Sequence, residues 1–210
     1  MESKKNTLIL TVIAVATLIV SVVGATFAFF QARVGDNVTK AVTVTTGTTG
    51  NTTFAITGAI AITADQTTFA SGKGDIKGNT TGTVQFVAPT KVGGDIAAAD
   101  LKTCYTVTVN ITSNNFVYTN GSIPELVLDV TKGSTKVIDS QDITTTKTNI
   151  QVPTAKGGST YTHTLTASAA GATVTDNWTV QVTLKNLSTD QQNNTSKTFS
   201  GSLSFAKATC

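Results

Sequence analysis

Strict alternation of apolar and polar side chains over residues 103–112 and 177–185 is the strongest constraint on this chain. In the first stretch one parity holds Tyr105, Val107, Val109 and Ile111, and the other holds threonine, asparagine and cysteine. Successive side chains of a strand point to opposite faces, so this pattern predicts strands with one buried and one outward face. Such strands belong to antiparallel sheets that cover a core on one side.

The two stretches also resemble each other. YTVTVNI at residues 105–111 and WTVQVTL at residues 178–184 share an aromatic, Thr, Val, any residue, Val, polar, aliphatic order. We interpret this match as two equivalent central strands.

Shorter strand segments and turn-forming residues follow one another along the rest of the chain. The segments expected as strands are residues 38–46, 53–63 (with Gly58 marking a bulge or a division), 83–88, 126–130, 136–139, 160–167 and 199–205. The Gly-rich residues 71–82 are expected to form a turn region, and residues 96–102 a helical turn with Asp95 or Asp100 as a cap. About nine strands predict an all-β fold, an antiparallel β-sandwich of the Ig-like or jelly-roll type.

Threonine supplies 40 of the 180 residues that follow residue 30. Its β-branched side chain restricts χ1 and suits a pleated surface, which favours strands. A disordered Ser/Thr stalk would lack the large apolar residues and the alternation seen here. We therefore expect a single Thr-rich β-sandwich domain over residues 31–210.

Residues 7–30 form a run of 24 residues without a charge, preceded by Lys4 and Lys5. As a helix this run would rise about 36 Å, enough to cross a hydrocarbon core of about 30 Å. The flanking lysines favour a cytoplasmic N-terminus, so the rest of the chain is expected outside the membrane. Residues 1–30 are thus either a secretory signal or a retained membrane anchor, and small-residue cleavage sites follow both Ala25 and Ala28.

The Lys4-Lys5 start and the sequence GATFAFF at residues 24–30 resemble the leaders of TasA and camelysin-like extracellular fibre proteins, which a SipW-type signal peptidase cleaves. The resemblance implies a cut between Ala28 and Phe29, and a secreted all-β protein of the cell surface or of a biofilm matrix. Residues 69–72 (FASG) match a phrase near the mature start of that family. No catalytic residue is carried over.

Two cysteines, Cys104 and Cys210, are expected to pair in an exported chain. Both fall on the outward parity of their strands, so a disulfide would fasten the C-terminal strand from the outer side or the rim of its sheet. Free thiols and a bond between two chains remain alternatives, because Cys210 is the last residue.

Few residues offer catalytic chemistry. The one histidine, His163, shares a strand face with Tyr161 and Leu165 and is interpreted as a buried, hydrogen-bonded residue. Camelysin-like relatives have been discussed as metalloproteases, but metal hydrolysis needs several nitrogen or sulfur ligands. We expect no enzyme, no metal and no cofactor.

The carboxylates are sparse. The sequence does not assign Asp129, Asp139 and Asp142 to one site, Asp75 lies in a Gly-rich turn, and Glu125 is expected to enter a strand rather than to assist a lysine–asparagine cross-link.

A net charge of +3 with scattered lysines gives no nucleic-acid footprint. The expected function is that of an exported structural protein of the cell surface or extracellular matrix. Such a protein would self-associate into a fibre by strand addition, with residues 29–46 completing a neighbouring sheet, and would meet the membrane through residues 7–30 at least during export. The alternative is a membrane-anchored monomeric adhesin that binds glycan or another surface ligand.

Overall fold

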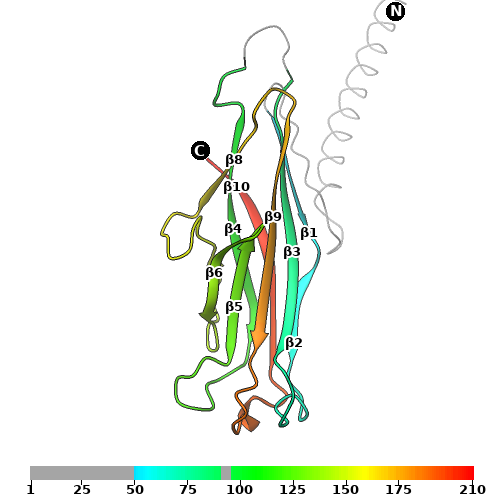
Figure 1. Ribbon diagram of the computed structural model, residues 1–210, viewed down its shortest axis with the longest axis vertical. Helices are drawn as coiled ribbons and strands as arrows, with labels where there is room; N and C mark the ends of the chain where they lie inside the picture. Colours follow the sequence, from blue (N-terminus) through cyan, green and yellow to red (C-terminus); the bar gives the residue numbers. More distant parts are fainter. Residues whose placement is uncertain (1–49, 91–95) are drawn as a thin grey trace, which may run out of the picture. The chain divides into compact units, whose positions relative to one another are not determined.

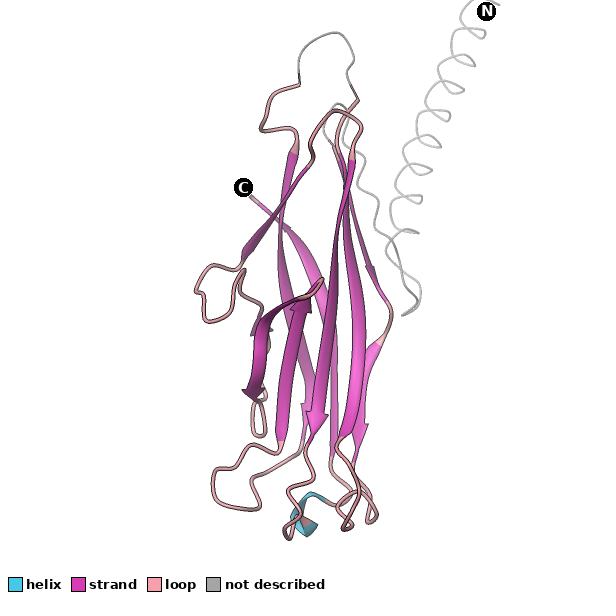
Figure 2. Ribbon diagram, in the orientation of Figure 1, coloured by secondary structure: helices cyan, strands magenta, loops and turns pink. Residues whose placement is uncertain are grey.

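The computed structural model describes residues 50–90 and 96–210, all of which belong to one compact unit of residues 39–210. Two five-stranded antiparallel sheets enclose a common apolar core. Figures 1 and 2 show how the strands are arranged. The predicted β-sandwich is therefore confirmed. The hydrophobic helix expected over residues 7–30 and the strand expected over residues 38–46 lie outside the described residues.

The first sheet has the order β1-β3-β9-β5-β6. These strands are β1 (Asn51–Ile56), β3 (Ile76–Val87), β9 (Thr173–Leu184), β5 (Leu126–Lys132) and β6 (Thr135–Asp142). A tight turn at Gly133 joins β5 to β6, as the turn residues predicted. In this sheet β1 and β6 are the edge strands.

The second sheet has the order β2-β10-β4-β7, and β8 also pairs with β4. Its strands are β2 (Ala59–Thr63), β10 (Thr198–Ala208), β4 (Lys102–Asn114), β7 (Ile150–Gln151) and β8 (Thr162–Thr166). The short strands β7 and β8 bond to different parts of the same side of β4.

The two alternating stretches of the sequence are β4 and β9, and each has strand neighbours on both sides. Val107 and Val109 of β4 and Val180 and Val182 of β9 are wholly buried. Every second residue thus faces the core from one sheet or the other, as predicted. The interpretation of these stretches as equivalent central strands is confirmed.

Gly58 divides residues 51–63 into two strands that enter different sheets. Its φ of 148° lies in a region that side chains rarely allow, and the chain leaves β1 there and enters β2. The division, one of the two predicted outcomes, lets one segment supply an edge to each sheet.

Residues 76–82, predicted to be part of a Gly-rich turn region, instead form the first half of β3. A Cβ atom at Gly78 would lie 2.9 Å from Cγ2 of Ile60, and one at Gly82 would lie 2.7 Å from Cδ2 of Leu203. The prediction was wrong because these glycines permit close packing against the opposite sheet. They do not provide turns.

Helical structure is minor and lies elsewhere than predicted. Residues 96–101 make a turn with a bond from the Asp100 N–H to the Ala97 carbonyl (2.9 Å). A short 3₁₀ helix forms at Gln192–Asn194. Ten strands are present in the described residues, against about nine expected. No described helix has the length and apolar character needed to cross a bilayer.

Replacing Gly82 with alanine is expected to destabilise the fold. The new methyl group would collide with Leu203 and Phe205, and overpacking of this kind costs about 1–3 kcal/mol, partly offset by a stiffer unfolded chain. Gly74→Ala is the matched control, because nothing lies within 4 Å of a Cβ atom there. Urea unfolding of both variants checks the prediction, and equal midpoints would contradict it.

Candidate functional site

Cys104 and Cys210 lie within disulfide-bonding distance, with their Cα atoms 5.1 Å apart. Ala208 of β10 pairs with Cys104 of β4, so the bond closes the end of this strand pair. Tyr105, the next residue, points into the core. Cys104 therefore points to the outer side of the sheet, where its sulfur lies 3.3 Å from the Thr164 hydroxyl.

The edge of β10 is open along part of its length. β4 pairs with β10 from Phe199 to Ala208, whereas β2 covers the other side only at residues 198–202. Within the described chain, residues 203–208 thus have a strand partner on one side. Figure 1 shows β10 in red and β4 in green. The disulfide secures this half-covered segment to β4.

A buried aromatic cluster joins the two sheets. The His163 ring lies 5.3 Å from the Tyr105 ring and 4.8 Å from the Trp178 ring, centroid to centroid. Its Nε2 atom lies 3.0 Å from the Val152 carbonyl oxygen. Burial lowers the pKa of His163, an effect that the Val152 hydrogen bond opposes. The predicted buried, hydrogen-bonded histidine is confirmed.

Asp176 ends this cluster toward the surface. It accepts a hydrogen bond from the Tyr105 hydroxyl at 2.5 Å and lies 2.7 Å from Nζ of Lys132. The Trp178 indole N–H donates to the same tyrosine oxygen at 3.2 Å. Burial, then the bond to Asp176, raises the pKa of Tyr105, so its hydroxyl stays protonated and serves as a donor.

A second polar network surrounds Glu125, which has no exposed surface and precedes β5. Its Oε1 atom accepts bonds from the Thr119 N–H and hydroxyl groups, and its Oε2 atom from the amides of Gln191 and Asn194, each at 2.7 Å. It makes no ion pair with a described lysine. The network ties Thr119, in the loop before β5, to Gln191 and Asn194.

The surface carboxylates do not form one common site, and the sequence did not assign them to one. Asp129 and Asp139 share Lys136, at 3.0 Å and 2.8 Å, and Asp139 also pairs with Lys156 at 2.7 Å. The two lysines lower the pKa of Asp139 to about 2. Asp142 instead accepts hydrogen bonds from the hydroxyl groups of Tyr118 and Thr144. Over residues 50–90 and 96–210 no group of three possible metal ligands occurs.

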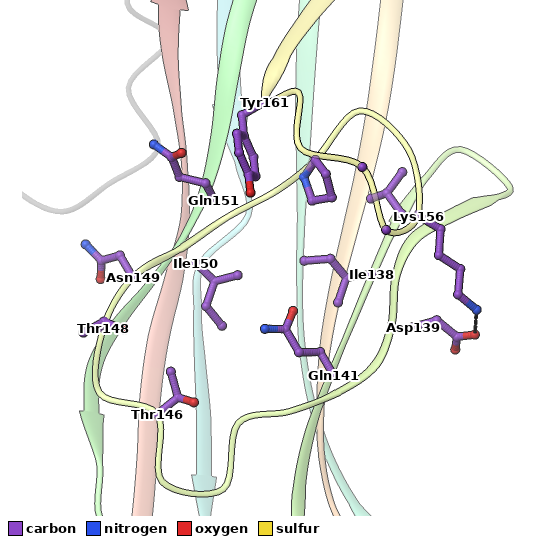
Figure 3. Close-up of a pocket in the computed structure, with 14 residues that line it drawn as sticks. Ile138, Asp139, Gln141, Thr146, Thr148, Asn149, Ile150, Gln151, Lys156 and Tyr161 are labelled. Carbon is purple, nitrogen blue, oxygen red and sulfur yellow. Dashed lines mark hydrogen bonds and ion pairs between the residues drawn. The ribbon is translucent and has the colours of Figure 1, made fainter.

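A groove of about 640 Å³ lies on the described surface, and Figure 3 draws the side chains that line it. All of its lining residues come from positions 137–161: strand β6, residues 146–151 and the loop 153–161. This stretch crosses from the edge of the first sheet to the edge of the second. The groove therefore lies between two sheet edges, on the connection that joins them.

A β-bulge shapes one wall of the groove. The pairing of β6 with β5 shifts between Leu128 and Val130, and Ser140 has a φ of 51°. The Asp129 carboxylate accepts a bond from the Ser140 N–H at 3.0 Å, which holds this conformation. The extra residue places Ile138 and Gln141 on the same side of β6, and both line the groove.

The loop 153–161 forms the opposite wall. A backbone bond between the Thr154 N–H and the Thr160 carbonyl (2.8 Å) closes its base, and Gly157, with a φ of 71°, makes its turn. It presents Lys156 on one side and Tyr161 on another, as Figure 3 shows. The sequence marked the turn but gave no signal for a groove, because its walls meet only in the folded chain.

Comparison with known proteins gives no match: no family model, no curated protein and no solved structure resembles this chain. The cleavage site expected between Ala28 and Phe29 lies outside the described residues. Of the residues singled out from the sequence, the structure brings Cys104 and Cys210 together. It also places Asp139 in the wall of the groove.

Reduction of the Cys104–Cys210 bond is expected to destabilise the fold. The bond closes a separation of 106 residues, for which loop-closure entropy predicts a loss of up to about 4–5 kcal/mol. Urea unfolding with and without reductant measures the loss, and the Cys104→Ser/Cys210→Ser double variant should match the reduced protein. Two thiols that alkylate without reduction would contradict the pairing.

The stability of the fold is expected to decrease as the pH falls below about 6.5. Because the pKa of His163 is lower in the folded than in the unfolded chain, the unfolded state takes up the proton first. Burial of the His163 ring, together with the nearby Lys132 charge, therefore lowers the free energy of unfolding at acidic pH. Urea unfolding between pH 7 and 5 should show this slope, and His163→Gln should reduce it.

An NMR titration of the His163 ring gives a second measurement that does not depend on the variant folding. An ordinary pKa for this ring, or an unchanged slope in His163→Gln, would contradict the prediction.

Proposed function

We propose that this chain is an exported structural protein of the cell surface or extracellular matrix, and that its copies associate by strand addition. The observation that carries the proposal is the edge of β10 at residues 203–208, which has a strand partner on one side only among the residues that the structure describes. An uncovered strand edge presents unpaired N–H and C=O groups, which pair readily with a strand from another chain. The finer fold type, Ig-like or jelly-roll with a preceding hydrophobic helix, is part of the same proposal.

The open segment of β10 is suited to accept a strand. Leu203 is buried and Phe205 is half-buried, whereas Ala206 and Lys207 are exposed. The Phe205 ring also stacks on Phe54 of β1, 5.8 Å away. With β4 and the disulfide holding its other side, this edge keeps a fixed register for an incoming strand.

Residues 29–46 are the proposed donor. Within this segment Val42 and Val44 share one parity and are separated by threonine, as in a strand with one apolar face. Cleavage between Ala28 and Phe29 would free the segment from the membrane. Retention of residues 1–30 would instead give a membrane-anchored monomeric adhesin, and N-terminal sequencing of the exported protein distinguishes the two.

Deletion of residues 31–46 is expected to abolish polymers and to leave a folded monomer. This deletion removes most of the donor strand and keeps the Ala28–Phe29 junction. Electron microscopy and sedimentation of the exported protein measure polymers, and the midpoint of urea unfolding reports the fold. Polymers that persist without this segment would refute strand addition.

A further inference from the structure

We propose that the groove between β6 and the loop 153–161 binds a neutral glycan chain. Its volume of about 640 Å³ lies within the range of about 300–1,000 Å³ typical of ligand sites. The inference is independent of strand addition, since the open β10 edge belongs to other residues of the chain.

Amide side chains supply the polar groups of this site. Gln141 and Gln151 are exposed, and their side-chain amides have no hydrogen-bond partner within the described residues. Asn149 uses its oxygen to accept a bond from the Ile111 N–H (3.0 Å), which leaves its NH₂ group for a ligand. An amide offers donors and an acceptor in one plane, and sugar hydroxyls both donate and accept. The Gln141 amide faces the hollow and can bond sugar hydroxyls there, whereas Asn149 and Gln151 lie on the other side of their segment from Ile150 and can serve only at the rim.

The apolar surface of the groove matches the C–H faces of a sugar ring. Tyr161 is 38% exposed, although it precedes a strand whose other large side chains are buried. Ile150 is half-buried beside it, and Ile138 and Pro153 are buried beneath. Figure 3 shows the side chains of Ile138, Gln141 and Ile150 around the middle of the hollow. An aromatic ring with a free hydroxyl, next to amides, offers both a stacking surface and a hydrogen bond.

The charges of the groove favour a neutral ligand. Its one lysine, Lys156, is already paired with Asp139 at 2.7 Å, and Asp139 also pairs with Lys136. A charged ligand would compete with this pairing for its partner. A neutral ligand can lie beside the pair and use its outer oxygen and nitrogen atoms.

An extended peptide fits this groove less well than it fits the β10 edge. Two register shifts and the positive φ of Ser140 interrupt the backbone of β6, so it offers no regular ladder. On the facing side β7 is two residues long. The polar groups that the groove offers to a ligand are therefore side chains. Side chains can hydrogen-bond a glycan without any regular strand pairing.

The test uses the folded, exported protein with neutral oligosaccharides of glucose, N-acetylglucosamine, galactose and mannose as probes. Amide NMR spectra should show shifts confined to residues 137–161, and titration should give a dissociation constant for the tightest probe. Tyr161→Ala and Gln141→Ala should each weaken that binding about tenfold or more.

Matched controls lie on other surfaces. Val117→Ala shortens an apolar side chain of almost equal exposure, and Gln85→Ala removes an exposed glutamine of β3. Both should keep full affinity, and unfolding midpoints should show that all four variants fold.

Three results would overturn the proposal. These are no shifts with any neutral probe at millimolar concentration, equal weakening by the control variants, and tighter binding of the peptide VTKAVTVTT (residues 38–46) in the same groove. The last result would assign the groove to a strand. Because the polymer assay measures a different property, loss of glycan binding leaves the strand-addition proposal standing, and the reverse also holds.

Discussion

The contact between β4 and β9 across the core is the interaction on which the rest of the structure depends. Each has strand neighbours on both sides in its sheet, and the edge-to-face pair of Tyr105 and Trp178 joins them across the core. Burying these faces removes apolar surface from water, which is the dominant stabilising term in a sandwich of this size. The other strands extend the two sheets outward from this contact.

Polar groups enter this core only where they are paired. The hydroxyl of Tyr105, the indole of Trp178 and the carboxylate of Asp176 form one chain of hydrogen bonds from the core to Lys132. At the other end Glu125 is buried with four donors around it. An unpaired polar group at either place would cost free energy, so both networks fix the positions of the loops and strands that supply them.

The surfaces to which we assign function are those where regular pairing stops. β2 ends its pairing with β10 at Ser202, which leaves an edge, and the bulge at Ser140 turns Gln141 toward a groove. The pairings β1–β3, β3–β9 and β5–β9 are regular over their whole length. The two proposed binding surfaces are therefore the parts of the sandwich with irregular strand pairing, whereas the regularly paired strands stabilise the fold.

The sequence by itself determined the fold class and the central strands β4 and β9, because period-two alternation is a local property. The tertiary structure chose the division over the bulge at Gly58 and brought Cys104 within bonding distance of Cys210. The tertiary structure alone decided the role of Gly78 and Gly82, which resemble turn residues until the opposite sheet is present. It also decided the partners of Glu125 and the groove of residues 137–161. Those depend on contacts between segments distant in the chain or set by sheet edges, and no local pattern encodes them.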